Sequence, residues 1–538
     1  MTSQASIRPY LNQAYLLGLM MMAVGLTLSP FLMGMANFWL VIVWVVEGFY
    51  SKSFNNKLSR FWHNKAAVLL AAFYVMHVVG LLWTTDFQYA MKDLRVKLPI
   101  LVLPFVLSSM EPLDRKRFDL LMQVYVLSVF VATLFSFSAY LKHEYEDIRE
   151  ISRFISHIRF CLNIVLCIAI ILYYVGLRGF TPADRVGRRR FVDELLRGFM
   201  LVWFFCQINV FESLSGYVVL AAVVILSLLF AFFHMKISWV WRFVVLGVAM
   251  AAFVIGVVFV AKEVRPLVET EKVDFATLEK KTALGNDYWH DTIHNPVEDG
   301  KYVGLYYCRK ELQEAWPQRS SLPLDGLASN GEDLEATLAR YLTSKDLRKD
   351  AEGVMALTDI DIRNIEQGVP NYNNWRHPGL RARLSSTLFE YELYRRNNDP
   401  NGGSFSQRIE FTRASFHIIG RHPWFGVGTG DVPQAFSEAY DEIHSPLKED
   451  FRFRAHNQYL AIAVAFGLVG LAFFLVVLFY PWFALRKRRS ALLTFLYTLF
   501  LVIMLLSMLA EDTLETQAGA SLFAFFEALL LCGIEWKE

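Results

Sequence analysis

Residues Phe451 to Tyr480 read FRFRAHNQYLAIAVAFGLVGLAFFLVVLFY. Two arginines and a histidine stand just before an apolar run that is long enough to cross a membrane, which takes about 20 residues. Further apolar runs recur along the chain, because 55% of its 538 residues are hydrophobic and 15% are aromatic. One soluble core would not bury that much apolar surface. The sequence therefore predicts an all-α, polytopic membrane protein.

About twelve transmembrane helices are expected from the apolar runs. They lie at 12–30, 33–50, 66–83, 98–110, 118–141, 160–177, 197–211, 216–234, 242–261, 457–480, 490–510 and 517–534. The run 98–110 is short and contains Pro99 and Pro104, so a kinked or re-entrant segment is the alternative there. No cleavage site follows the N-terminus clearly, so the first helix is expected to stay as an anchor.

The runs divide the chain into three predicted parts. These are an N-terminal bundle of about nine spans (1–261), a large loop domain (262–455) and a C-terminal bundle of about three spans (456–538). The loop domain is expected to be mainly helical and laid over the bundle. Helical signals lie at 332–356, 380–397 and 405–419, whereas 264–324 has turn formers without periodicity and reads as irregular.

Basic residues predict the orientation, because Lys and Arg are retained on the cytoplasmic side of a membrane. The connections at 51–65, 114–117, 178–190, 234–242 and 486–490, together with Lys537, are rich in them, and the opposite short loops are poor. Both termini are then cytoplasmic and the segment 262–455 lies outside. The net charge of +2 adds nothing about partners, and no nucleic-acid partner is predicted. Cys308 is the one cysteine outside the predicted spans, so no internal disulfide is expected there.

His456 is the first candidate for chemistry, because it begins the tenth span at the water boundary. A histidine there can act as a general base or hydrogen-bond a phosphate. The plainer alternative is an interfacial residue that caps the helix or extends to the membrane surface. Its neighbour Asn457 is equally suited to cap that helix.

Arginines form the second group of candidates. Arg408, Arg413 and Arg421 precede a glycine-rich turn, and Arg454 stands two residues before His456. The planar, permanently charged guanidinium suits a diphosphate, although such residues also pair with lipid headgroups or nearby acids. Arg159 lies at the outer end of the sixth predicted span, where an arginine is costly unless it faces a cavity or a ligand.

Two further features flank these arginines. The run from Gly426 to Gly430 (GVGTG) could cradle a phosphate with its amides, but it lacks the lysine and strand of a P-loop, so a tight turn is favoured. Glu511 and Asp512 lie in a short outer turn with Glu515, where they either orient a histidine and pair with arginines or are simply solvated. No Cys/His cluster has zinc spacing, and no metal or cofactor is predicted.

These motifs resemble the O-antigen ligase and polymerase superfamily. The resemblance rests on RHPWFGVGTG at 421–430, HNQYL at 456–460 and FGLVG at 466–470, in that order. Single-loop topology and the pieces SHIRF at 156–160 and EDTLETQ at 511–517 are similar to Bacteroidetes-type members. The resemblance covers most of the chain.

The resemblance implies a metal-independent, inverting glycosyltransferase of the bacterial inner membrane that takes a glycan from undecaprenyl pyrophosphate. His456 would be the base for the acceptor hydroxyl, while Arg408 and Arg159 would bind the donor pyrophosphate. Arg413, Arg421, Arg454, Asn457, Glu511 and Asp512 would give supporting contacts. The expected acceptor is the lipid A core sugar of an O-antigen ligase, with membrane lipids as further partners.

Alternatives stay open within the superfamily and outside it. An O-antigen or polysaccharide polymerase and a protein O-glycan ligase share these motifs. Many members carry Ser-Arg at the outer start of the eighth span, where this chain reads ESLSGY at 212–217. Either Arg159 or a loop arginine then replaces that arginine, or this member has a different donor geometry or reduced activity, and Glu212 could serve as an acid on the acceptor side. A transporter or flippase would show duplicated halves, and a scaffold would leave the convergence of arginines and His456 unexplained.

Overall fold

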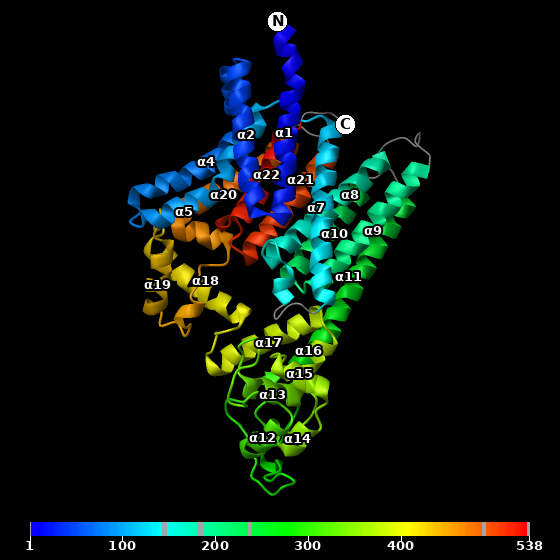
Figure 1. Cartoon of the computed structure of the whole chain (residues 1–538), viewed down its shortest axis with the longest axis vertical. Coiled ribbons are helices and arrows are strands. Elements are labelled where there is room, and N and C mark those ends of the chain that lie inside the picture. The colour runs from blue at the N-terminus through cyan, green and yellow to red at the C-terminus, as the bar shows by residue number, and fades with distance from the viewer. Residues whose placement is uncertain (1, 143–147, 181–187, 235–237, 487–490, 535–538) are drawn as a thin grey trace.

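The computed structural model describes residues 2–142, 148–180, 188–234, 238–486 and 491–534. Parts of the basic connections at 178–190, 234–242 and 486–490, and Lys537, lie outside these ranges. The described chain is mostly helical (Figure 1).

The helices of the first half follow one another with short connections. They are α1 (Thr2–Leu28), α2 (Pro30–Tyr50), α3 (Phe54–His63), α4 (Lys65–Val79), η1 (Gly80–Trp83), α5 (Phe87–Lys97), α6 (Pro99–Ser109), α7 (Arg115–Leu141), η2 (Ile148–Ile151), α8 (His157–Phe180), α9 (Arg188–Val210), α10 (Leu214–His234) and α11 (Trp239–Val268).

The second half begins with short elements and ends with long helices. They are η3 (Phe275–Thr277), β1 (Val297–Glu298), β2 (Lys301–Tyr302), α12 (Arg309–Ala315), η4 (Trp316–Gln318), α13 (Leu334–Ser344), α14 (Ala351–Met355), α15 (Asp359–Glu366), α16 (Tyr372–Arg376), α17 (Leu380–Asn397), α18 (Ser404–Arg421), α19 (Val432–Glu442), η5 (Glu449–Phe451), α20 (Gln458–Arg486), α21 (Ala491–Ala510), η6 (Thr513–Glu515) and α22 (Gln517–Leu531).

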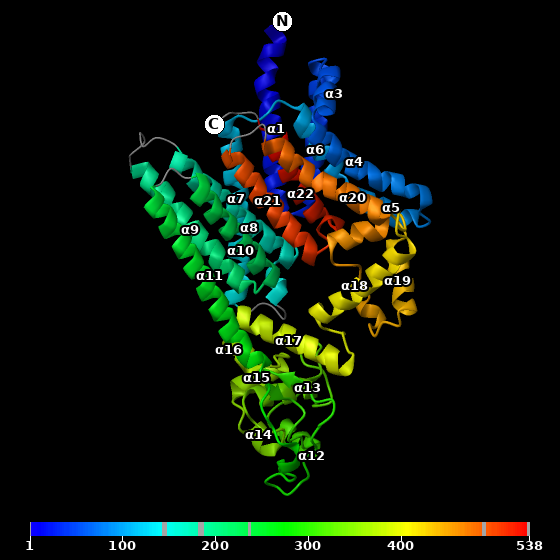
Figure 2. The same cartoon turned by 180° about the vertical axis from the view of Figure 1, so that it is seen from behind.

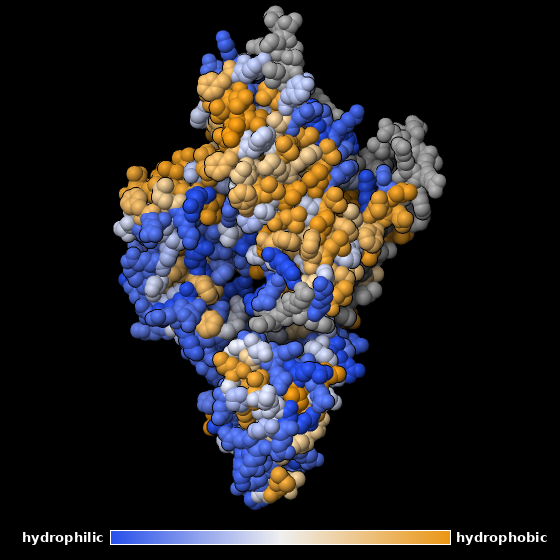
Figure 3. Space-filling model, in the orientation of Figure 1, coloured by the Kyte–Doolittle hydropathy of each residue, from blue (hydrophilic) through white to orange (hydrophobic). Residues whose placement is uncertain are grey.

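Eight helices within the described ranges are long and apolar enough to cross a membrane, which identifies a multi-pass membrane protein. They are Arg8–Leu28, Pro30–Tyr50, Lys65–Trp83, Arg115–Leu141, His157–Gly176, Leu214–His234, Gln458–Leu485 and Ala491–Ala510. Hydrophobic residues cover a broad part of the bundle surface, whereas the far end of the molecule is mainly hydrophilic (Figure 3).

The predicted count of about twelve spans is not confirmed. The runs at 98–110, 197–211, 242–261 and 517–534 fall in α6, α9, α11 and α22, which are not among the eight. At 1.5 Å per residue, the 11 residues of α6 and the 15 of α22 are too short to cross a core about 30 Å thick. The helix α9 begins with three arginines and carries further charges. The proline at the start of α6 stands at a first-turn position, which a helix tolerates.

The short helix α22 lies inside the bundle. It contacts α1, α2, α4, α5, α6 and α21, and its residues from Gly519 to Leu530 are all buried (Figures 1 and 2). Such complete burial explains why this helix is apolar on every side. The turn at 511–516 leads directly into this buried helix, so its C-terminal end is fixed by the packing of α22.

The segment between α11 and α17 builds a separate small core around Trp316, Leu338 and Tyr341. Figure 1 shows this unit extending beyond the end of the bundle opposite the N-terminus, whereas the sequence predicted a domain laid over it. The predicted irregularity of 264–324 is confirmed from residue 269 on, apart from short helices and the two-residue strands, whereas 264–268 still belong to α11. The helix predicted over 332–356 is two helices, because the chain turns at Asp346, which has a left-handed φ of 59°.

One carboxylate in this small core is expected to make stability depend on pH. Burial opposes ionisation of Asp361, but hydrogen bonds from Lys345, Tyr341 and Thr358 lower its pKa from 3.8 to about 2. Because the pKa of Asp361 is lower in the folded protein than in the unfolded chain, its ionisation stabilises the folded state at pH values above about 4. This contribution is lost as the pH falls from about 4 towards 2. We expect Asp361→Asn to reduce local stability by about 2 kcal/mol at pH 7 and by much less near pH 2.

Hydrogen exchange of the backbone over 334–366 measures this effect in the whole protein. Asp359→Asn is the matched control, because Asp359 lies in the same helix and its side chain is 90% exposed. An equal change in exchange for the two variants would contradict the role assigned to Asp361.

Candidate active site

The helices predicted at 380–397 and 405–419 are present as α17 and α18, and a loop follows them that packs into a break in α20. The backbone of Gly467 leaves the helical conformation, with φ 66° and ψ −168°. The loop fills the gap: Val427 N donates to Val464 O (3.0 Å), Gly428 N to Ala465 O (2.9 Å), and Leu468 N to the loop residue Pro423 (2.8 Å). The groups freed by the broken helix are therefore bonded inside the protein, as a membrane-embedded backbone requires.

The glycines of this loop serve close packing. A Cβ on Gly426 would lie 2.4 Å from the backbone of Ala465, and one on Gly428 would lie 2.8 Å from Thr84. The amides of Gly426, Val427, Gly428 and Gly430 all donate to acceptors within the protein. These four amides are thus not free to cradle a phosphate, in agreement with the tight turn favoured from the sequence.

Gly426→Ala is expected to lower the stability of the purified protein by about 3 kcal/mol. A positive φ of 65° disfavours alanine by about 1–2 kcal/mol, and forced packing adds about 1–3 kcal/mol. Thermal unfolding in detergent measures the loss. The control is Gly420→Ala, in α18, because a Cβ there meets nothing within 4 Å. Equal unfolding temperatures for the two variants would refute this account of the loop.

His456 lies directly before α20 with a left-handed φ of 44°. Its ring stacks on Phe411 of α18, with centroids 5.4 Å apart. Its Nδ1 lies 3.5 Å from Glu511 Oε2 and 3.9 Å from Asp512 Oδ1, and it makes no hydrogen bond by geometry within the described chain. The cap of α20 is Asn457, whose Oδ1 accepts from Leu460 N at 3.0 Å. His456 is thus positioned by the Phe411 ring and by the nearby carboxylates of Glu511 and Asp512, and Asn457 caps the helix.

Arg408 reaches the same carboxylate from α18. Its Nη2 donates to Glu511 Oε1 at 2.8 Å, and its Nη1 donates to Ser404 O at 3.2 Å. Its Nε is buried and has no hydrogen-bond partner among the described residues. Arg408 and His456 therefore meet on the two oxygens of one glutamate.

Arg159 comes from the other half of the chain. Its Nη1 donates to Ser156 Oγ at 2.8 Å, and its buried Nε finds no acceptor in the described ranges. Its charge helps to lower the pKa of Glu511. Arg159 therefore lies within electrostatic reach of the Glu511 carboxylate without a direct ion pair to it in the described structure.

Arg454 connects the turn after α21 to α5. Its guanidinium lies 3.4 Å from both Asp512 and Glu515 and donates to the Tyr89 hydroxyl at 2.8 Å. Five of the predicted residues therefore converge with Arg408: His456, Arg159, Arg454, Glu511 and Asp512.

The two carboxylates beside His456 titrate differently. Burial favours the neutral form of Glu511, but His456, Arg408 and Arg159 hold its pKa below the usual value. Burial raises the pKa of Asp512, against the opposing charges of Arg454 and His456. The charges around the site therefore favour the ionised form of Glu511, whereas burial opposes ionisation of Asp512.

Three predicted residues lie in other surroundings. Arg413 pairs with Glu410 at 2.6 Å, and Arg421 pairs with Glu442 on α19. Glu212 accepts a hydrogen bond from Gly379 N at 2.5 Å and so fastens the turn between α9 and α10 to the start of α17.

The sequence analysis did not identify Tyr89, Asp93 and Lys97 of α5 as neighbours of the site. The spacing of Asp93 and Lys97 by four residues was the one signal that the sequence offered.

His456, Glu511 and Asp512 could together hold a metal ion, because their ligand atoms lie within 4.8 Å of one another. Both carboxylates, however, already pair with guanidinium groups: Glu511 with Arg408 and Asp512 with Arg454. A cation at this place would compete with two fixed positive charges.

A hollow with hydrophilic walls opens beside α18, between this helix and the end of α7, with α17 beneath (Figure 3). About one third of the side-chain surface of Arg408, Arg454 and His456 is exposed. A base and several guanidinium groups are therefore accessible together at one edge of the bundle, an arrangement suited to moving a group away from a phosphate-bearing donor.

Comparison with known proteins supports this interpretation. Residues 380–475 match the sequence model of a family described as O-antigen ligase. The matched segment runs from α17 through the glycine loop and His456 to the middle of α20. A search of curated proteins finds no match.

Proposed function

We propose that the chain is a member of the O-antigen ligase superfamily, whose model matches residues 380–475, and that it transfers a glycan from undecaprenyl pyrophosphate to the hydroxyl of a lipid A core sugar. The single observation that carries the proposal is the meeting of His456 and Arg408 on the carboxylate of Glu511. It joins a base and a cation in one exposed site.

His456 is the proposed general base. Its Nδ1 faces Glu511, so a neutral ring that carries its proton on Nδ1 has Nε2 available to accept one. The anionic Glu511 favours this tautomer and stabilises the ring once it becomes positive. Removing the acceptor proton is then the task of His456.

Arg408 and Arg159 are the proposed ligands of the donor pyrophosphate. Each keeps a buried Nε–H without an acceptor in the described chain, and such donors are rare unless a ligand or a water satisfies them. Fixed guanidinium groups stabilise the negative charge that grows on a leaving pyrophosphate. This supports a reaction that does not depend on a metal.

The proposed reaction is a single displacement. The acceptor oxygen forms a bond to the anomeric carbon of the donor glycan while the bond from that carbon to the pyrophosphate oxygen breaks. The acceptor proton goes to His456, and the electron pair leaves with undecaprenyl pyrophosphate. Attack opposite the leaving group inverts the anomeric configuration.

The proposed location is the bacterial inner membrane, with both termini cytoplasmic and 262–455 periplasmic as a loop domain between bundles at 1–261 and 456–538. The basic connections support this orientation. The helices α1 and α22, the first and last of the described chain, also lie away from the unit formed by α12 to α16 (Figure 1). A periplasmic site would meet a donor that is held in the outer leaflet.

The test uses the purified full-length protein in proteoliposomes with an undecaprenyl-pyrophosphate-linked glycan and lipid A core. We expect one glycan per acceptor. A ladder built on the lipid-linked donor would identify a polymerase instead, and a glycosylated polypeptide would identify a protein ligase. No transfer to any of these acceptors would refute the proposal. Rates are expected to be unchanged by EDTA, and a loss restored by a divalent ion would place a metal at His456, Glu511 and Asp512.

A further inference from the structure

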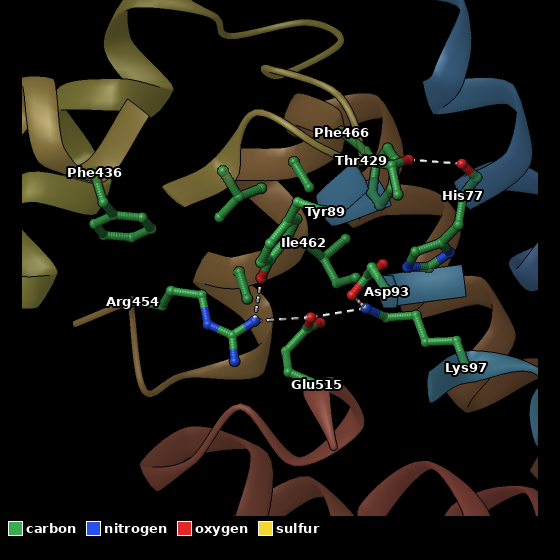
Figure 4. A pocket seen from close by; sticks show the side chains of 13 residues that line it. His77, Tyr89, Asp93, Lys97, Thr429, Phe436, Arg454, Ile462, Phe466 and Glu515 are labelled. Atoms are coloured by element: carbon green, nitrogen blue, oxygen red, sulfur yellow. Dashed lines mark hydrogen bonds and ion pairs between the residues drawn. The ribbon is translucent and has the colours of Figure 1, made fainter. Parts of the chain in front are cut away.

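A buried group of charges lies behind the site, where α5 meets the turn before α22 (Figure 4). Lys97 Nζ is 2.5 Å from Asp93 Oδ1 and 2.7 Å from Glu515 Oε2. Only 1% of Lys97 is exposed. The neighbouring cavity, which His77 also lines, has a volume of about 20 Å³. That is room for about one water molecule, so neither the donor nor the acceptor can reach Lys97.

Glu515 connects Lys97 to the site. Arg454 contacts Glu515 Oε2 at 3.4 Å, and Gln458 Nε2 donates to Glu515 Oε1 at 3.1 Å. Gln458 also accepts from Leu514 N at 2.6 Å. Three side chains thus fix one carboxylate in the turn that carries Glu511 and Asp512.

The charges of this group support one another. Burial disfavours the ammonium of Lys97, but Asp93 and Glu515 raise its pKa above the usual value. Burial likewise opposes ionisation of Glu515, while Lys97 and Arg454 lower its pKa. Without the lysine charge, Glu515 would draw more strongly on Arg454, which also holds Asp512 at 3.4 Å. Losing one partner of a buried ion pair is costly because the other charge is left uncompensated.

We propose that Lys97 is a positioning residue for glycan transfer: by binding Glu515 it fixes Arg454 and the turn 511–515, so that Glu511 and Asp512 face His456. The inference rests on the proposed function, because it assumes that transfer depends on His456. It assigns to α5 a role in the reaction although α5 lies outside the matched segment 380–475.

The test compares Lys97→Met, Lys97→Arg and the double variant Asp93→Asn/Lys97→Met in the transfer assay. We expect Lys97→Met to lower kcat by about 30-fold with the donor KM within about threefold of wild type, since loose positioning slows the chemical step. Lys97→Arg should recover kcat to within about threefold. The double variant removes one charge of each sign, so it should recover thermal stability while kcat stays low, because Glu515 still lacks its lysine.

Two results would overturn the inference. One is a wild-type kcat in Lys97→Met. The other is a double variant whose kcat recovers together with its stability, which would mean that Lys97 only balances buried charge. The double variant decides the question even if Lys97→Met does not fold. His456→Ala is measured in parallel: an active His456→Ala protein counts against the proposed function, whereas an inactive one beside a fully active Lys97→Met counts against the positioning role alone.

Discussion

His456→Ala is expected to reduce kcat for glycan transfer by about 10³-fold, within the range of 10²–10⁴ contributed by a positioned general base. The loss should occur in folded protein, because the ring is one-third exposed and His456 does not cap α20. Initial rates with the lipid-linked donor and the lipid A core acceptor measure it. Donor binding should be nearly unchanged, since Arg408 and Arg159, the proposed ligands of the pyrophosphate, remain.

His417→Ala is the matched control for this variant. His417 is equally exposed, at 34% of its side chain, and also contacts a glutamate, Glu442. It lies on α18 but belongs to the contact between α18 and α19. If His417→Ala and His456→Ala lose activity to the same extent, or if His456→Ala stays within tenfold of wild type, His456 is not the base.

The local sequence predicted the helices of the site, but it did not predict the break at Gly467 in α20. The sequence predicts where α17 ends and where α18 begins, because Asn398 and Gly402 in the turn between them adopt positive φ, which asparagine and glycine tolerate. The run 457–480 predicted one unbroken span, because Gly467 stands among apolar residues. The break becomes tolerable only through hydrogen bonds between the loop at 423–428 and residues 464–468 of α20, and bonds between such distant segments leave no local sequence pattern.

Among the candidate residues, too, local sequence patterns were informative and contacts between distant segments were not visible. Arg408, Arg413 and Arg421 share one helix. At about 100° per residue, Arg413 and Arg421 each point about 140° away from Arg408, in opposite senses around the helix. Only Arg408 therefore faces Glu511. Arg159 was predicted because an arginine at a span end is costly unless it faces a cavity or a ligand, and His456 because it begins a span at the water boundary. Lys97 was missed because its partner Glu515 is 418 residues away.

Arg408→Ala is expected to lower kcat/KM by about 10²–10³-fold, the usual effect of removing one donor from a site where negative charge develops. Arg408→Lys should lose about tenfold, because an ammonium keeps the charge but not the planar fork. Arg421→Ala on the same helix is the control: its side chain is 57% exposed and pairs with Glu442. Steady-state rates at several donor concentrations separate kcat from KM.

The double variant Arg408→Ala/Glu511→Gln decides what Arg408 does. If Arg408 only neutralises Glu511, removing both charges relieves the buried anion and the double variant should be more active than Arg408→Ala. If Arg408 binds the pyrophosphate through its Nε, which has no acceptor among the described residues, removing the glutamate cannot replace that donor. The double variant should then be no more active than Arg408→Ala, because it lacks both the cation for the leaving group and the anion that supports His456. We expect the second result, and recovery to within tenfold of wild type would refute the donor-binding role of Arg408.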